Sequence, residues 1–234
     1  MADWSAAHKR RLRDVWRSAG WPCHDLLELD LLAAGLLSRH WDGEGRETLR
    51  VSDAGIQLLA ATRQRNQSAR SAHEGLVAQV AAEMQRAGRI VWRGLTLRAP
   101  VVGENGATAW VMAMPDVFSI RQTTVEDYVE PLAHEIKVSR ADLLSDLRKP
   151  AKGQAYAALA SQCWYVVREG IARVDEVPSD YGLMEARSGG LEVLRPAPRR
   201  PMRLPFSAWM ALARAHGESG ADGNSQAWLG GDGL

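Results

Sequence analysis

Three residues near the middle of the chain are of the types that cut phosphodiester bonds. Pro115-Asp116 is followed, nineteen positions after the aspartate, by Glu135-Ile136-Lys137. Two carboxylates suit a magnesium or manganese ion, because such hard cations take one or two carboxylates and leave the other positions to water and phosphate oxygens. The metal would polarise the phosphoryl oxygen and lower the pKa of a bound water. Lys137 would orient that water or neutralise charge in the transition state.

This chemistry requires two neighbouring strands. Residues 132–138 form a short run bounded by Pro131 and by polar residues, as strands often are. In a strand, side chains two apart share a face, so Glu135 and Lys137 project together while Ile136 points toward a core. Residues 117–120 form another strand-like run directly after Asp116, and the segment between the two runs suits a hairpin with a long loop. We therefore expect Asp116 to lie beside Glu135 on adjacent strands.

A simpler interpretation is that Glu135 and Lys137 form a surface ion pair on a solvated strand face. The choice of lysine argues against it, because the chain has 29 basic residues, of which 25 are arginine and only 4 are lysine. A compact ammonium differs from a planar guanidinium in geometry and in how readily its pKa shifts. A lysine in an arginine-rich chain therefore favours a chemical role.

The sequence around these residues resembles the PD-(D/E)XK nuclease superfamily. The resemblance rests on Pro115-Asp116, on Glu135-Ile136-Lys137, on the following Ser139-Arg140-Ala141-Asp142, and on the stretch from Tyr156 through Cys163-Trp164-Tyr165-Val166-Val167. The run HEIKVSRADLLSDL is most similar to MmcB-like proteins associated with bacterial DNA repair. The likeness extends from about residue 71 to 216 and includes GLMEA and LEVLRPAP, which resemble that group's late strand pair.

The resemblance implies a fold and a set of roles. The fold would be α/β, a restriction-endonuclease-like mixed central sheet flanked by helices. Asp116 and Glu135 match the metal-binding acids, and Lys137 matches the catalytic lysine. Glu74 matches an acid that many members carry on the first helix as an outer metal ligand, although an acid in a helix's first turn also suits the helix dipole. Gln154 and Tyr156 resemble a supporting glutamine-tyrosine pair of related nucleases, at a shorter spacing.

Basic residues after the second strand offer a surface for nucleic acid. The candidates are Arg140, Arg148, Lys149 and Lys152. Such side chains beside a metal site would hold a phosphate backbone without reading its sequence. The alternative is a helix surface on which Asp142 and Asp146 pair with these cations. Pro150 and Gly153 indicate a break there, which places the cluster on a loop beside the site.

The order of the predicted helices and strands divides the chain into two parts near residue 70. Residues 1–68 predict a helix over 5–18, a second helix ending near Leu37, a β-hairpin, and a helix opened by Ser52 or Asp53. This order resembles a small winged-helix-like α+β module, which would bind DNA or instead serve as a protein-interaction or dimerisation module. Residues 64–72 are polar and predict a linker. By the resemblance, residues 69–216 are expected to form the nuclease-like domain, and the composition of residues 217–234 predicts a flexible Gly-rich tail.

Composition limits the remaining possibilities. The 234 residues are 46% hydrophobic with a formal net charge of +1, so any DNA-binding surface must be local. Cys23 and Cys163 stand far apart without a CxxC motif, which argues against a zinc site or a disulfide scaffold. No apolar run suggests a membrane span, and the N-terminus lacks a secretory segment, so a cytoplasmic protein is expected.

Two classes of function follow from the sequence. The first is a metal-dependent DNA nuclease acting in DNA repair or in defence against foreign DNA. The second is a non-catalytic DNA-binding or regulatory protein that keeps a nuclease-like scaffold. The presence of Asp116, Glu135 and Lys137 together favours the first, because a scaffold does not require all three chemical groups.

Overall fold

The computed structural model describes residues 4–103 and 106–215. The chain forms two compact units, Met1–Arg70 and Ser71–Leu234. The predicted Gly-rich tail over 217–234 lies outside the described residues.

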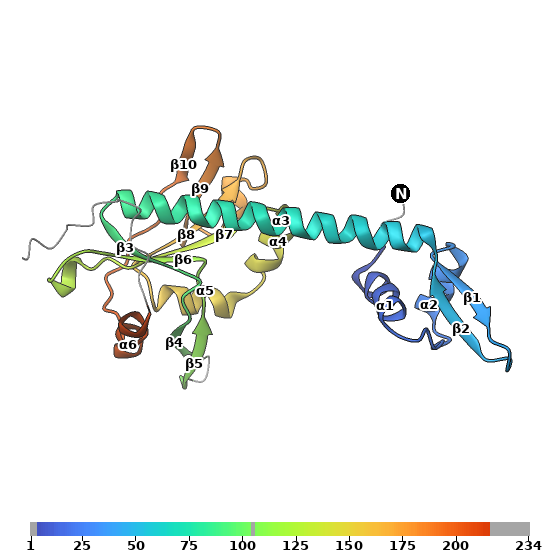
Figure 1. Cartoon of the computed structure of the whole chain (residues 1–234). Helices are drawn as coiled ribbons and strands as arrows, with labels where there is room; N and C mark the ends of the chain where they lie inside the picture. The colour runs from blue at the N-terminus through green and yellow to red at the C-terminus, as the bar shows by residue number, and fades with distance from the viewer. Residues whose placement is uncertain (1–3, 104–105, 216–234) are drawn as a thin grey trace, which may run out of the picture. The chain divides into compact units, whose positions relative to one another are not determined.

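Both units contain helices and strands (Figure 1). The α-helices are α1 (Ala6–Arg17), α2 (Leu26–Ala33), α3 (Asp53–Arg86), α4 (Arg140–Leu147), α5 (Pro150–Ala157) and α6 (Phe206–Arg214). The strands are β1 (Leu37–Trp41), β2 (Glu47–Val51), β3 (Arg89–Arg93), β4 (Leu97–Val102), β5 (Thr108–Ala113), β6 (Val117–Arg121), β7 (Leu132–Lys137), β8 (Gln162–Arg168), β9 (Tyr181–Arg187) and β10 (Gly190–Arg195). Two short 3-10 helices cover Glu126–Tyr128 and Val174–Glu176.

The N-terminal unit has the predicted order of two helices, a β-hairpin and a third helix. β1 and β2 pair antiparallel, and Leu12 of α1, Leu31 of α2 and Leu49 of β2 are buried in one cluster. The second helix ends at Ala33, however, and not near Leu37 as predicted. Gly35 follows with a φ of 68°, a left-handed conformation that ends helices readily.

The prediction of a linker over residues 64–72 was wrong, because α3 runs through it as one helix of 34 residues. The polar composition indicated a linker, but residues 57–74 contain neither glycine nor proline. Alanine, glutamine and arginine dominate this stretch, and all three favour helix. A polar helical segment was therefore mistaken for a connection.

The second unit is built on a mixed sheet of six strands in the order β10-β9-β8-β7-β6-β3. β7, β8 and β9 run parallel to one another, whereas β3, β6 and β10 pair antiparallel. The predicted late strand pair corresponds to β9 and β10. β3 ends just before Gly94, whose φ is 58°, and β4 then pairs with β5 in a separate hairpin.

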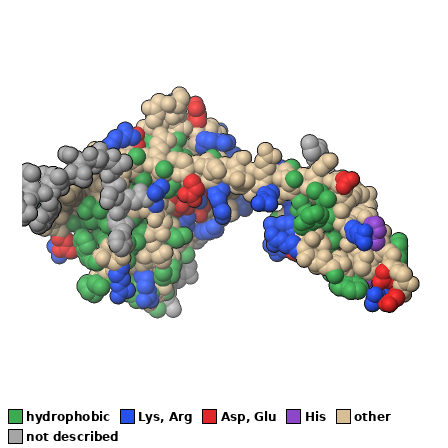
Figure 2. Space-filling model, in the orientation of Figure 1, with side chains coloured by type: hydrophobic (Ala, Val, Ile, Leu, Met, Phe, Trp, Pro, Cys, Tyr) green, Lys and Arg blue, Asp and Glu red, His purple; other side chains and the backbone are tan. Residues whose placement is uncertain are grey.

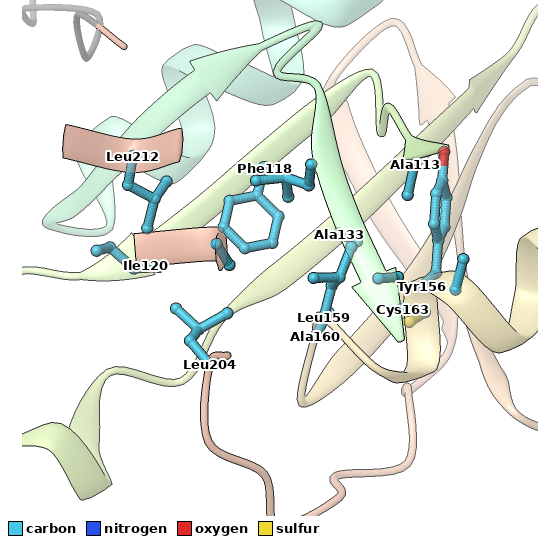
Figure 3. Packing of buried hydrophobic residues seen from close by; sticks show 14 of the residues in the cluster. Ala113, Phe118, Ile120, Ala133, Tyr156, Leu159, Ala160, Cys163, Leu204 and Leu212 are labelled. Carbon is cyan, nitrogen blue, oxygen red and sulfur yellow. The ribbon is translucent and has the colours of Figure 1, made fainter. Parts of the chain in front are cut away.

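Both faces of this sheet are covered. The second half of α3 packs Leu76, Val77 and Val80 against one face, where Ile136 and Val166 are buried. The other face carries a larger core that includes side chains of α5, α6 and the β4–β5 hairpin. Figure 3 shows part of this core, with residues such as Phe118, Leu159 and Leu212 converging. The unit is therefore mixed α/β, as predicted.

Other composition-based expectations concern the surface and the cysteines. Cys163 is buried in β8, and Cys23 is exposed. Among the described residues, no helix is long and apolar enough to cross a membrane. Figure 2 shows lysine and arginine side chains distributed over both units, with acidic side chains among them.

His134 of β7 links the stability of the fold to pH. Its side chain is fully buried, on the opposite face from Glu135, with its ring stacked on Trp164 at a centroid distance of 6.5 Å. Burial, and then the nearby charge of Arg89, lower the pKa of His134 to about 3. In the unfolded chain this histidine has a pKa of about 6.5. Between these values the unfolded state binds a proton that the folded state does not, so stability falls as the pH falls.

We predict that this histidine makes the protein about 2 kcal/mol less stable at pH 5 than at pH 7. The measurement is urea unfolding of the wild type and of His134→Leu at both pH values. Between pH 7 and pH 5, the variant should lose about 2 kcal/mol less free energy of unfolding than the wild type does. Equal pH dependence in the two proteins would contradict the prediction.

Candidate active site

The pairing of β6 with β7 brings Asp116 and Glu135 together, as the sequence predicted. Val117 pairs with His134 in the antiparallel register, so the next position outward places Asp116 opposite Glu135. The backbone N–H of Ile136 donates to Asp116 Oδ2 at 2.7 Å and fixes that carboxylate at the strand end. The backbone N–H of Gly94 donates to the Asp116 carbonyl at 3.0 Å, which holds the same residue from β3's side.

Glu135 is the centre of the site. It is 5% exposed, and its carboxylate accepts three hydrogen bonds from side chains. Lys137 Nζ donates to Oε1 at 2.8 Å, Lys152 Nζ donates to the same oxygen at 2.5 Å, and Tyr156 OH donates to Oε2 at 2.8 Å. The expected sharing of one strand face by Glu135 and Lys137 is thus observed, and the alternative of a solvated surface pair is wrong, because both side chains are buried.

Asp146 of α4 is a second buried carboxylate beside the first. It is 4% exposed and accepts from Lys152 at 2.9 Å and 3.0 Å through its two oxygens. Tyr165 OH donates to Asp146 Oδ2 at 3.1 Å, and Lys137 Nζ lies 3.7 Å from the same oxygen. Two carboxylates and two ammonium groups therefore form one connected network.

Charge and burial set the protonation of the network. Burial disfavours the charged form of Lys137, but Glu135, and then Asp146 and Asp142, outweigh it and raise the pKa of Lys137. Burial and then the charge of Glu135 raise the pKa of the Tyr156 hydroxyl. Lys137 is therefore a cation and Tyr156 a hydrogen-bond donor at neutral pH. Neither group is suited to act as a general base.

Asp116 lies at the less neutralised end of the site. Burial, followed by the charge of Glu135, raises the pKa of Asp116, and the Ile136 N–H and His73 act in the opposite direction. His73 of α3 places Nε2 3.4 Å from Asp116 Oδ2. Both the Ile136 N–H and the His73 ring thus contact the same carboxylate oxygen.

The fit of this site to a divalent metal depends on Asp116 and Glu135. No group of three or more His, Cys, Asp or Glu side chains among the described residues is arranged to hold a metal ion. Two opposed carboxylates nevertheless match magnesium, which takes few protein ligands and keeps several waters. The mutual repulsion of Asp116 and Glu135 is relieved by a cation between them. The donor set thus fits a two-carboxylate site.

Several residues proposed from the sequence lie elsewhere. Glu74 is exposed on α3, and Gln154 is exposed on α5. Arg140 donates to Glu176 through both terminal nitrogens, and to the carbonyl of Ile171 at 3.2 Å. Its guanidinium is therefore engaged by Glu176. The helix-surface alternative is wrong for Arg140, whereas Asp146 does pair with Lys149 and Lys152 as that alternative predicted.

The basic segment after β7 is mostly helical. Arg148 and Lys149 are exposed where α4 gives way to α5, and Lys149 Nζ lies 3.8 Å from Asp146 Oδ1. Lys152 lies inside α5, so the prediction that the whole cluster is a loop was wrong. Pro150 does mark the break, because proline suits the first turn of a helix, whereas Gly153 lies within the new helix.

Sequence reasoning missed three members of the site. His73 and Tyr165 were not considered as site residues, and Asp146 was considered only as a surface partner of basic neighbours. Asp146 and Lys152 approach because α4 and α5 meet across a two-residue break, which the spacing alone does not show. The one available signal concerned Tyr165. In the parallel pairing of β7 with β8, Tyr165 lies opposite Glu135, so the two side chains are on the same face of the sheet.

Comparisons with known proteins add little to this geometry. No protein-family model matches the sequence, and no curated protein matches it significantly. A solved structure of a protein of unknown function from Silicibacter pomeroyi is similar, at 21% identity and a TM-score of 0.40. The match covers 58% of this chain and 77% of that one.

We predict that Tyr156→Phe lowers the free energy of unfolding by about 2 kcal/mol, because it removes a buried hydrogen bond to a charged acceptor. The measurement is urea unfolding at pH 7. Tyr128→Phe is the matched control, since Tyr128 is 61% exposed and should lose almost nothing. Equal stability of Tyr156→Phe and wild type would show that the hydroxyl of Tyr156 does not stabilise Glu135.

Proposed function

We propose that the protein is a metal-dependent DNA nuclease that hydrolyses phosphodiester bonds in DNA repair or in defence against foreign DNA. The observation that carries the proposal is the convergence of Asp116, Glu135 and Lys137 at the ends of β6 and β7. These are the residues on which the resemblance to PD-(D/E)XK nucleases rests. A buried glutamate and lysine are costly to a fold, so a chemical role accounts for them better than a structural one.

Each residue of the site has a distinct role in this proposal. Asp116 and Glu135 hold Mg²⁺ or Mn²⁺, which supplies Lewis-acid polarisation of the phosphate and a more acidic water. Lys137 remains protonated and stabilises negative charge that develops on the phosphate. Tyr156 fixes the rotamer of Glu135 through Oε2. Arg148 and Lys149, both exposed nearby, contact the DNA backbone.

The arrangement of helices and strands in each of the two units supports a finer fold assignment, which is part of the same proposal. We propose that residues 71–215 form a restriction-endonuclease-like domain and that the N-terminal unit is winged-helix-like. The first is supported by a mixed sheet with helices on both faces and acids at adjacent strand ends. The second is supported by the order of two helices, an antiparallel hairpin and a third helix.

The test is cleavage of single-stranded, duplex and branched DNA by purified protein with Mg²⁺, Mn²⁺ or EDTA. Glu135→Gln and Lys137→Met should each lower the cleavage rate about a hundredfold or more, because each removes a charge from the reacting centre. Lys149→Met is the matched control for the lysine: its side chain is 60% exposed, and it loses one backbone contact but no charge at the reacting centre, so it should lower the rate far less than Lys137→Met.

Glu74→Gln tests the outer-ligand assignment in the same assay. The cleavage rate should stay almost unchanged if the exposed Glu74 only interacts with the dipole of its helix. The rate should fall if Glu74 approaches the metal when DNA is bound. Metal-dependent cleavage that survives in both Glu135→Gln and Lys137→Met would point to another site or to a contaminant. Inactivity of the wild type on every substrate would refute the nuclease proposal.

A second candidate function is a non-catalytic DNA-binding or regulatory protein. One observation favours it: in the described residues Glu135 is engaged by two ammonium groups and a tyrosine, which already compensate its charge. A fold that kept the network only for structure would show this arrangement. DNA binding without cleavage, unaffected by Glu135→Gln, would support that function.

The N-terminal unit offers a basic groove between α1 and the first part of α3. Arg13, Arg17 and Arg63 line it, and Trp16 and Ile56 contribute apolar surface. Cations around a groove favour a phosphate backbone, whereas an exposed tryptophan and isoleucine favour a protein partner. We propose that this groove binds DNA, with a protein partner or a second copy of the chain as the alternative.

We predict that the triple substitution Arg13→Gln, Arg17→Gln and Arg63→Gln weakens DNA binding. Affinity should fall less steeply with salt, the slope decreasing by about 0.9 for each phosphate group that the variant no longer neutralises. The measurement is fluorescence anisotropy of labelled duplex DNA over a salt series. A control triple substitution to glutamine removes exposed arginines that pair with acids in the second unit: Arg121, Arg199 and Arg203. Unchanged affinity in the first variant would favour the protein-interaction alternative.

A further inference from the structure

Lys152 occupies the position in which its charge competes most directly with a metal at Glu135. Its Nζ lies 2.5 Å from Glu135 Oε1, and 2.9 Å and 3.0 Å from the two oxygens of Asp146. Its side chain is 27% exposed, whereas those of Glu135 and Asp146 are 7% and 3% exposed. The ammonium group thus reaches two buried carboxylates from the more solvated side of the network.

We propose that Lys152 is a positioning residue, a displaceable counter-ion that neutralises Glu135 in the metal-free protein and withdraws onto Asp146 when a divalent cation binds. This inference rests on the proposed metal site and deepens it. It assigns to Lys152 a role in metal occupancy, in place of the DNA contact expected from the sequence.

The hydrogen bonds of Glu135 show why one donor must yield. Lys137 and Lys152 both use Oε1, and Tyr156 uses Oε2. A divalent ion that takes either oxygen as a ligand therefore meets a donor already there. Two positive charges on one oxygen also repel a third, so metal binding is favoured when one ammonium group moves away.

Lys152 is better able to move than Lys137. The Lys137 side chain is 7% exposed and its Nζ lies within 4 Å of carboxylate oxygens from Glu135, Asp142 and Asp146. Lys152 is more exposed, and its bidentate contact with Asp146 does not depend on Glu135. Withdrawal from Glu135 therefore leaves Lys152 with a charged partner, so its charge is not stranded.

The type of residue also suits this role. An ammonium group on a flexible four-carbon stem can shift between two acceptors by rotation of its side chain, whereas a planar guanidinium is tied to one bidentate geometry. Lysine is used here although the chain has only 4 lysines against 25 arginines. The same arrangement explains how Asp146 can be buried, because its carboxylate accepts hydrogen bonds from Lys152 and Tyr165.

The experiment is calorimetric titration of the full chain with MnCl₂, in the absence of DNA. Lys152→Met should lower the Kd for Mn²⁺ about tenfold, because a like charge within a few ångströms of the metal is removed. Lys149→Met is the matched control, because it deletes the same charge from the same segment. Lys149 contacts Asp146 at 3.8 Å and is 60% exposed, so its Kd should stay within about twofold of wild type.

Two further variants define the site and guard against misfolding. Glu135→Gln should abolish the binding that Lys152→Met enhances, which ties the effect to this carboxylate. Lys152→Gln retains polarity at the same position and should also bind Mn²⁺ more tightly than wild type. Thermal unfolding followed by circular dichroism is the control that tests whether each variant is folded.

The outcomes separate this inference from the proposed nuclease activity. Equal Kd values for wild type, Lys152→Met and Lys149→Met, or weaker binding in Lys152→Met, would overturn the counter-ion role while leaving the metal site intact. Failure of wild type and Lys152→Met to bind Mn²⁺ would overturn both the counter-ion role and the metal site. Tighter Mn²⁺ binding in Lys152→Met, together with a wild type that cleaves none of the DNA substrates, would support the counter-ion role and refute the nuclease proposal.

Discussion

A buried carboxylate at the end of a central strand is the constraint on which the rest of the second unit depends. An isolated buried charge costs a fold several kcal/mol, so Glu135 requires donors from elements that pack around it. β7 supplies Lys137, and α5 supplies Lys152 and Tyr156. The packing of α5 against the sheet therefore also supplies two of the three hydrogen bonds to Glu135. Figure 3 shows Tyr156 within the hydrophobic core of that face, from which its hydroxyl group extends.

The alternation of side chains along β7 separates this polar network from the other core. Glu135 and Lys137 face α4 and α5, while Ile136 packs on the opposite face with the aliphatic side chains of α3. His134 shares the face of Ile136 and is neutral there, because burial disfavours the charged form of its ring. Successive residues of β7 thus point into different environments, one into the charged network and the next into the apolar layer on the other face of the sheet. A shift of one position in the register of β7 would exchange the two and abolish both.

Local patterns predicted the parts of the site that lie on strands. The alternation over residues 132–138 and the run after Asp116 were sufficient to predict that Asp116 lies beside Glu135 on adjacent strands, and the observed register then places the two acids opposite each other. The contributions of helices were not predicted. Asp146 approaches Lys152 through the angle between α4 and α5, and His73 reaches Asp116 from a helix that was expected to begin after a linker. Helix orientation depends on tertiary packing, which a linear pattern does not record. The error over residues 64–72 has a different cause, because the local sequence there, polar but without glycine or proline, is compatible with an exposed helix.

The two acids of the site differ in how far their charges are compensated, and this difference bears on where a cation would first be attracted. Glu135 accepts from two ammonium groups, whereas the contacts of Asp116 in the described residues are a backbone N–H and a histidine. The uncompensated negative charge therefore lies toward Asp116, whose pKa is raised by burial and then by Glu135. A cation drawn to Asp116 would relieve the repulsion between the acids and would weaken the attraction of Glu135 for its ammonium partners. The charge compensation of Glu135, which stabilises the fold, would therefore compete with metal binding at Glu135. Asp116, whose contacts in the described residues include no ammonium group, would be the acid that attracts a cation first.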